Sequence, residues 1–133
     1  MRRLLALVLL VIGAVVPADA HHSISGVYDR NRPVTIAGVI AEFHFVNPHP
    51  FVTLNVDTGA GRPDVWRLEM DNRVELVDVG MTAETLKAGD RITVTGSRAR
   101  DGSRSLYVLR LDREADAFRY EQVGSSPRIG RIR

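Results

Sequence analysis

VTIAGVIAEFHFV, residues 34–46, is the stretch that decides the fold of this chain. It is rich in β-branched and aromatic residues, which favours an extended strand. Strict alternation divides its side chains between two faces, with Val39, Ala41, Phe43 and Phe45 on one and Ile40, Glu42 and His44 on the other. Gly38, near its start, predicts a bulge or a sharp bend, which lets one long strand serve two sides of a small barrel.

Further strands are predicted downstream, separated by turn residues. In the segment 47–50, NPHP, two prolines restrict the backbone and predict a stiff turn that holds His49. Residues 51–57 and 64–70 each alternate and predict a hairpin around a glycine-containing loop. Its inward side chains are expected to be Val52, Leu54, Val56, Trp66, Leu68 and Met70.

The second half of the chain predicts one short helix and two more strands. Asp71 or Asn72 can cap the helix, and Gly80 can end it. Residues 90–99 and 106–112 predict the fourth and fifth strands, joined by a turn that contains Asp101 and Gly102.

This order of elements favours an all-β fold. Five strands with a short helix between strands 3 and 4 are typical of a five-stranded OB-fold-like barrel, which often binds ligands on one face. Another small β-barrel or a sandwich is the competing interpretation, since local patterning does not determine strand order. The expected barrel domain spans residues 21–123. Residues 124–133, with glycine, serine, proline and three arginines, predict a flexible basic tail.

The N-terminus has the pattern of a secretory signal peptide. Two arginines, an apolar run over residues 4–16 and the small residues of PADA at 17–20 follow one another in the expected order. A membrane anchor is the alternative, but the run falls short of the roughly 20 apolar residues that span a bilayer. We therefore predict a signal peptide over residues 1–20, cleavage after Ala20, and a periplasmic or secreted protein that has no membrane attachment after cleavage.

The charge balance argues against nucleic acid as a partner. Cleavage would remove two arginines and one aspartate, so the formal net charge would change from +2 to +1. A near-neutral chain gives no general reason to expect nucleic acid or an anionic membrane as partner. The chain contains no cysteine, so its stability must come from burial and hydrogen bonding without disulfides.

The histidines are the main functional clue. All four, His21, His22, His44 and His49, lie in the first half of the chain. Neutral imidazole is the commonest metal ligand among side chains, so these four residues are candidate metal ligands. Chance clustering of a few surface residues is the alternative interpretation. Glu42, Glu69 and Asp71 are the nearest carboxylates in the predicted strands, and one of them could orient a ligating histidine.

The predicted cleavage site would itself create a chelate. After cleavage at Ala20, His21 offers both its α-amino nitrogen and its ring nitrogen to one ion, an arrangement of the histidine-brace kind. Cleavage after Ala18 would instead place His21 third in the chain, again a suitable Cu(II) chelate. Nitrogen ligands of this kind favour Cu(II) among the first-row divalent ions, so copper is the expected cofactor.

Several motifs carry a resemblance to a known family. They are HHS at 21–23, VNPHPF at 46–51, WRLEMDN at 66–72, LKAGD at 86–90 and YEQVGSSPR at 120–128. The chain resembles a family of short exported bacterial proteins catalogued as a domain of unknown function. The resemblance implies export and an OB-like barrel, but the family has no established activity that could be inferred for this chain. Many relatives have a different polar residue at the position of His44, so the resemblance favours His21, His22 and His49 as ligands.

Three functional hypotheses follow. The first is a periplasmic OB-like binding module with a histidine-based copper site near its N-terminus. The second is a metal-free barrel that binds a partner protein, peptide or glycan through its open face. The third is a copper-dependent oxidase of the histidine-brace kind. The first two, neither of which is an enzyme, are favoured, because the chain has no defensible Ser-His-Asp spacing, no phosphate-binding glycine loop and no HExxH motif.

Overall fold

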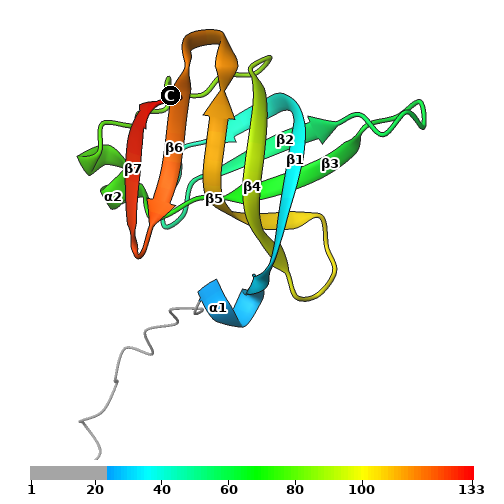
Figure 1. The fold of residues 1–133 in the computed structure, drawn as a ribbon, viewed down its shortest axis with the longest axis horizontal. Helices are drawn as coiled ribbons and strands as arrows, with labels where there is room; N and C mark the ends of the chain where they lie inside the picture. The colour runs from blue at the N-terminus through cyan, green and yellow to red at the C-terminus, as the bar shows by residue number, and fades with distance from the viewer. Residues whose placement is uncertain (1–23) are drawn as a thin grey trace, which may run out of the picture.

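The computed structural model describes residues 24–133, which form a mostly β structure (Figure 1). None of the helices in this part of the chain is long and apolar enough to span a membrane. The elements are, in order, α1 (Ile24–Val27), β1 (Tyr28–His44), β2 (Phe51–Val56), β3 (Asp64–Glu69), α2 (Arg73–Asp78), β4 (Arg91–Ala99), β5 (Ser105–Arg113), the 3-10 helix η1 (Glu114–Asp116), β6 (Phe118–Val123) and β7 (Ser126–Arg131).

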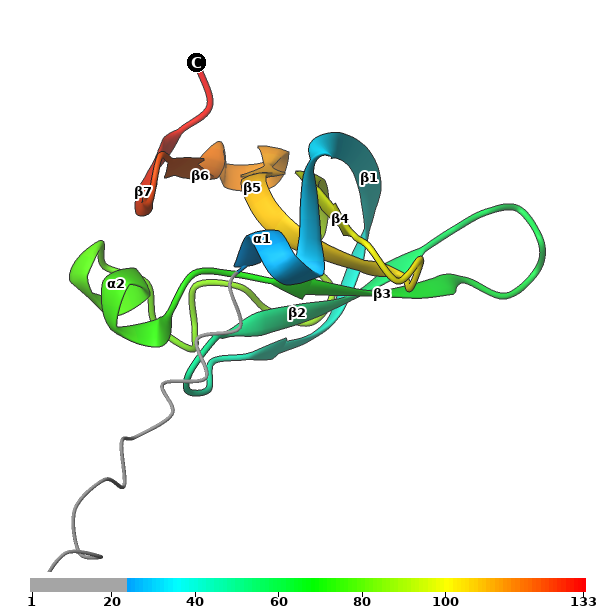
Figure 2. The same ribbon diagram turned by 90° about the horizontal axis from the view of Figure 1, so that it is seen from below.

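All the strands belong to one seven-stranded sheet with the order β3-β2-β1-β4-β5-β6-β7. Neighbours in this order are antiparallel, and β3 also pairs with β5 in parallel, so β1 to β5 form a partial ring. Strands β6 and β7 extend from β5 on the side where α2 lies (Figure 2). The predicted β class and the helix between the third and fourth strands are confirmed, whereas the described residues contain seven strands and not the five predicted.

Strand β1 belongs to both sides of the ring. It pairs with β4 from Tyr28 to Val39 and with β2 from Val39 to His44. Its pairing with β2 shifts register between Ile40 and Glu42. A bulge adds one residue and reverses the alternation, so the faces predicted for residues 39–45 are wrong: Ile40 is 1% exposed and lies in the core, on the same side as Phe43.

The bend predicted at Gly38 is also misplaced by a few residues, but the glycine has another role. A Cβ atom built on Gly38 would overlap the backbone carbonyl oxygen of Asn55 and would lie 3.0 Å from Leu54 Cγ. The glycine therefore permits β1 and β2 to approach closely where β1 leaves β4 and joins β2.

The inward positions predicted for the hairpin are largely correct. Val52, Leu54, Leu68 and Met70 are fully buried, while Trp66 packs partly buried against the same core. The predicted helix cap is also confirmed at Asn72, whose side-chain oxygen accepts a hydrogen bond of 2.9 Å from the amide of Glu75. The helix is thus fixed directly after β3.

The predicted flexible basic tail is wrong as a description of residues 124–133. Residues 126–131 form β7, which pairs with β6 along its whole length. Gly124 makes the turn with a φ of +64°, and Pro127 is buried. The prediction failed because it counted the apolar side chains available for burial, whereas the strand is held by backbone pairing to β6. The barrel boundary predicted at residue 123 therefore divides a hairpin.

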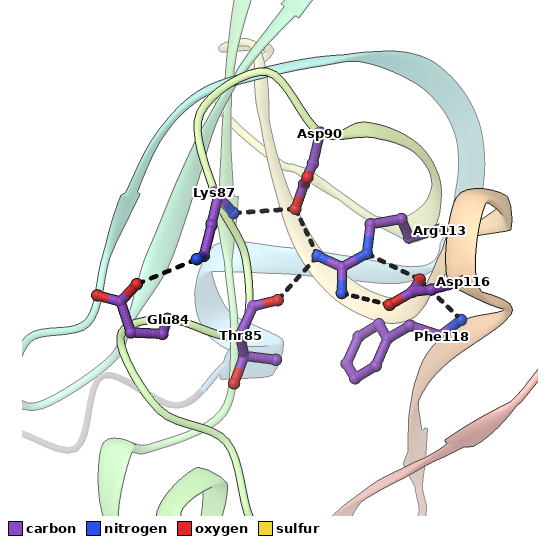
Figure 3. A network of polar contacts seen from close by, with 7 residues as sticks. All are labelled: Glu84, Thr85, Lys87, Asp90, Arg113, Asp116 and Phe118. Atoms are coloured by element: carbon purple, nitrogen blue, oxygen red, sulfur yellow. Dashed lines mark hydrogen bonds and ion pairs between the residues drawn. The ribbon is translucent and has the colours of Figure 1, made fainter.

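Arg113 fixes the loop before β4 to the end of β5 (Figure 3). Its guanidinium donates to the Thr85 carbonyl at 2.8 Å and to the carboxylates of Asp90 and Asp116. The same group lies over the ring of Phe118, with its central carbon 5.2 Å from the ring centroid. One half-buried cation thus connects three segments of the chain.

Candidate functional site

His49 lies in the loop between β1 and β2, and its ring is held at one nitrogen only. Nδ1 is 3.2 Å from the carbonyl oxygen of Met70 and 4.0 Å from Oε1 of Glu69. Because a carbonyl oxygen can only accept, Nδ1 is the donor in this hydrogen bond, and in the neutral tautomer the lone pair is on Nε2. Nε2 contacts no hydrogen-bonding partner among the described residues, and the side chain is 29% exposed. Histidines that ligate a metal commonly donate their other ring N–H to a carbonyl or carboxylate in this way.

Glu69 connects His49 to the start of the described chain. The hydroxyl of Tyr28 donates a 2.7 Å hydrogen bond to Oε2 of Glu69, while Oε1 faces the His49 ring. Tyr28 follows α1 directly and packs with Ile24 and Tyr107 in a small cluster separate from the main core. The first described residues therefore lie close to the carboxylate that borders His49.

A buried carboxylate, Asp71, lies two residues after Glu69 in the sequence. Asp71 is 6% exposed and accepts hydrogen bonds from the Asn72 amide at 2.7 Å and from the Gln122 side chain at 2.6 Å. The Tyr120 hydroxyl in turn donates to Gln122. Burial, followed by the charge of Asp71, raises the pKa of Tyr107 well above its ordinary value, so this phenol stays neutral. Glu69 and Glu75 raise the pKa of Tyr107 further, while the positive charge of Arg30 lowers it.

His44 belongs to a different part of the surface. The register places His44, Phe51 and Glu69 in one row across β1, β2 and β3. The His44 ring stacks on Phe51 with 4.2 Å between centroids, and its Nε2 lies 3.2 Å from Glu42. Two strand spacings, about 10 Å, separate the His44 and Glu69 backbones, and Phe51 stands between them. The contacts of His44 are thus with Phe51 and Glu42, whereas those of His49 are with Met70 and Glu69.

The two N-terminal candidates, His21 and His22, lie outside the described residues. Within residues 24–133 there is no group of three His, Asp or Glu side chains that could hold a metal ion. His49 is thus the predicted ligand with the most suitable geometry. Glu69, predicted as a possible orienting carboxylate, lies beside it.

The sequence interpretation missed Tyr28 and Gln122. Each forms its hydrogen bond across a large separation along the chain, Tyr28 to Glu69 over 41 residues and Gln122 to Asp71 over 51 residues. The alternation of residue types along the chain cannot predict such contacts, because they form only when β3 pairs with β5 and brings distant segments together.

The sequence of the chain matches a known protein family. A family model described as DUF6152, a family of unknown function, matches residues 8–107. No curated protein matches the chain significantly. No solved structure does so either.

Proposed function

The chain belongs to DUF6152, a family of unknown function, and since the family supplies no activity we propose a function from the residues themselves. The protein is an exported, OB-like binding module that holds a copper ion between His49 and the N-terminal residues His21 and His22. Cleavage of the leader after Ala20 generates the α-amine that completes the chelate.

The orientation of the His49 ring carries this proposal. Its Nδ1 hydrogen bond to the Met70 carbonyl leaves Nε2 as an exposed lone pair, which is the state needed to bind a metal ion. The imidazole type of the ligands and the terminal amine favour copper over other first-row divalent ions.

The approach of the chain supports the pairing with His21 and His22. His21 and His22 precede Ile24, the first described residue, by three and two residues along the chain. Ile24 packs with Tyr28, whose hydroxyl binds Glu69 beside His49. The described chain therefore starts on the side of the sheet where the third ligand lies.

The strand pairings support an OB-like barrel. Each of β1 to β5 pairs with two others of the five, in the cyclic order β1-β2-β3-β5-β4. OB-folds bind ligands on the face of their second and third strands and in the loop between the first and second. His49 belongs to that loop, so the proposed metal would lie in the region where such folds bind ligands, which supports the proposal.

The test is copper titration of protein purified after export, with its N-terminus determined by mass spectrometry. We expect His21→Ala and His49→Ala each to weaken copper binding by at least about tenfold, because each removes a ligand. His44→Ala is the matched control and should change the affinity by less than about twofold. Protein that retains residues 1–20 should bind as weakly as the His21 variant. Unchanged affinity in both His21→Ala and His49→Ala would refute the site.

A second function is favoured by one observation on the outer face of β1 to β3. The Phe51 ring is half-exposed, with the Arg67 guanidinium 3.4 Å from its centroid and the His44 ring stacked on it. Because these two groups cover both faces of the Phe51 ring, a peptide or a glycan would contact the outer side of the stack, through the guanidinium, the imidazole and the ring edge. Binding of a peptide or glycan here should be unchanged when a chelator removes metal ions, and it should be lost in Phe51→Ala.

The third hypothesis, a copper-dependent oxidase, has its own test: reductant-driven turnover of oxygen by the copper-loaded protein would indicate it.

A further inference from the structure

The β6–β7 hairpin carries a hollow of about 490 Å³ on its surface, at the edge of the sheet that β7 forms. Its lining is dominated by arginine, with one acidic residue and a glycine. The residues are Arg119, Glu121, Arg128, Ile129, Gly130, Arg131 and Arg133. The formal net charge of the whole chain is only +2, so this cluster is a local excess of cations.

Most of this positive charge is not neutralised within the described residues. Arg119 is held by Asp112, to which it donates from Nε at 2.7 Å and from Nη2 at 3.0 Å. The remaining nitrogen, Nη1, lies 3.9 Å from Glu121. Arg128 and Arg131 are exposed and form no ion pair with any residue of the described part of the chain. By the strand register, Arg128 lies opposite Glu121 on the face that carries Arg119, whereas Arg131 is the partner of Phe118 and starts from the other face of the hairpin.

Gly130 leaves room for a ligand among these side chains. It is the register partner of Arg119, so a side chain at position 130 would project from the same face of the sheet as Arg119. A Cβ atom built there meets no atom within 4 Å. The hollow is thus open where the strand lacks a side chain, and its volume falls in the range of small-molecule sites.

We propose that this hollow binds a phosphate group. Guanidinium groups present forked donors that match phosphate oxygens, and they remain charged at every physiological pH. Arg128 supplies free donors on the face that carries Arg119, and Arg131 borders the same hollow from the neighbouring position in β7. Arg119 supplies a cation that Asp112 has already fixed in place. The same chemistry suits free phosphate and the phosphate of a lipid headgroup.

The test measures binding of inorganic phosphate at low ionic strength by calorimetry. In parallel, it measures co-sedimentation with phosphatidylcholine vesicles prepared with and without phosphatidylglycerol. The double variant Arg128→Gln/Arg131→Gln removes the free donors. The control Arg32→Gln/Arg62→Gln removes the same charge from exposed positions elsewhere. Gly130→Val fills the hollow without changing any charge.

Both hollow variants should weaken binding by about tenfold or more, since charge-assisted hydrogen bonds are lost or blocked, while the control pair changes it by less than about twofold. Binding of free phosphate identifies a soluble ligand, and binding only to vesicles with phosphatidylglycerol identifies a headgroup; either result supports the site when both hollow variants abolish it. Equal effects of the hollow and control pairs, full binding by Gly130→Val, or no binding in either arm would overturn it. Circular dichroism of each variant verifies folding.

Discussion

Replacement of Gly38 by alanine should destabilise the fold by about 2 kcal/mol. The new methyl group would overlap the Asn55 carbonyl oxygen, and it would lie 3.0 Å from Leu54 Cγ and 3.1 Å from the Asn55 carbonyl carbon. Overpacking costs about 1–3 kcal/mol, and contact with backbone belongs at the upper end because backbone cannot rotate away. Loss of chain entropy in the unfolded state offsets about 0.4–1 kcal/mol of this cost.

The assay is thermal and urea unfolding followed by circular dichroism. For a domain of this size, about 2 kcal/mol corresponds to a fall in Tm of roughly 8 °C. Gly130→Ala is the matched control, because its methyl group meets no atom within 4 Å, and its free energy of unfolding should stay within about 0.5 kcal/mol of the parent. Equal stability of the two variants would refute the close approach of β1 and β2 as the reason for the glycine.

Three further predictions concern polar contacts. Arg113→Met should lower the free energy of unfolding by about 2 kcal/mol, since it leaves half-buried acceptors unpaired, whereas Lys87→Met removes only an exposed pair and should cost under about 0.5 kcal/mol in the same urea assay. The hydrogen bond from Arg119 lowers the pKa of Asp112 below its ordinary 3.8, so its contribution is present above that pH and lost as the pH falls through the lowered value; Asp112→Asn should flatten the acid limb of a stability–pH curve. Tyr28→Phe removes the hydrogen bond between the start of β1 and the end of β3 and should cost about 1 kcal/mol by urea unfolding.

Alternation along the sequence predicted the central hairpin well but failed along β1. Val52, Leu54 and Leu68 were placed correctly because β2 and β3 pair without a bulge. In β1 the register shift after Ile40 turns the following side chains to the opposite faces, and no residue type in VIAEF marks where the extra residue lies. A strict period of two therefore holds only up to the bulge.

The candidate site was predictable in its residue types and not in its geometry. The two prolines around His49 indicated a fixed turn, and the nearby carboxylates indicated an orienting partner. Which carboxylate is near which histidine depended on the strand register, which sets Glu69 beside His49 and Glu42 beside His44. The hollow on the β6–β7 hairpin escaped prediction because the arginines of residues 124–133 were interpreted as a tail.

The sharing of β1 between β4 and β2 has a consequence for cooperativity. Since one strand completes both sides of the partial ring, neither side can open while the other stays intact, and the amides of β1, β2 and β4 should exchange with deuterium only through global unfolding. Strand β7 pairs with β6 alone, whereas β6 is held in the core by the fully buried Tyr120, so the amides of β7 should exchange through a separate, lower-energy opening. The chain would then behave in hydrogen exchange as one rigid unit with an edge strand that opens independently.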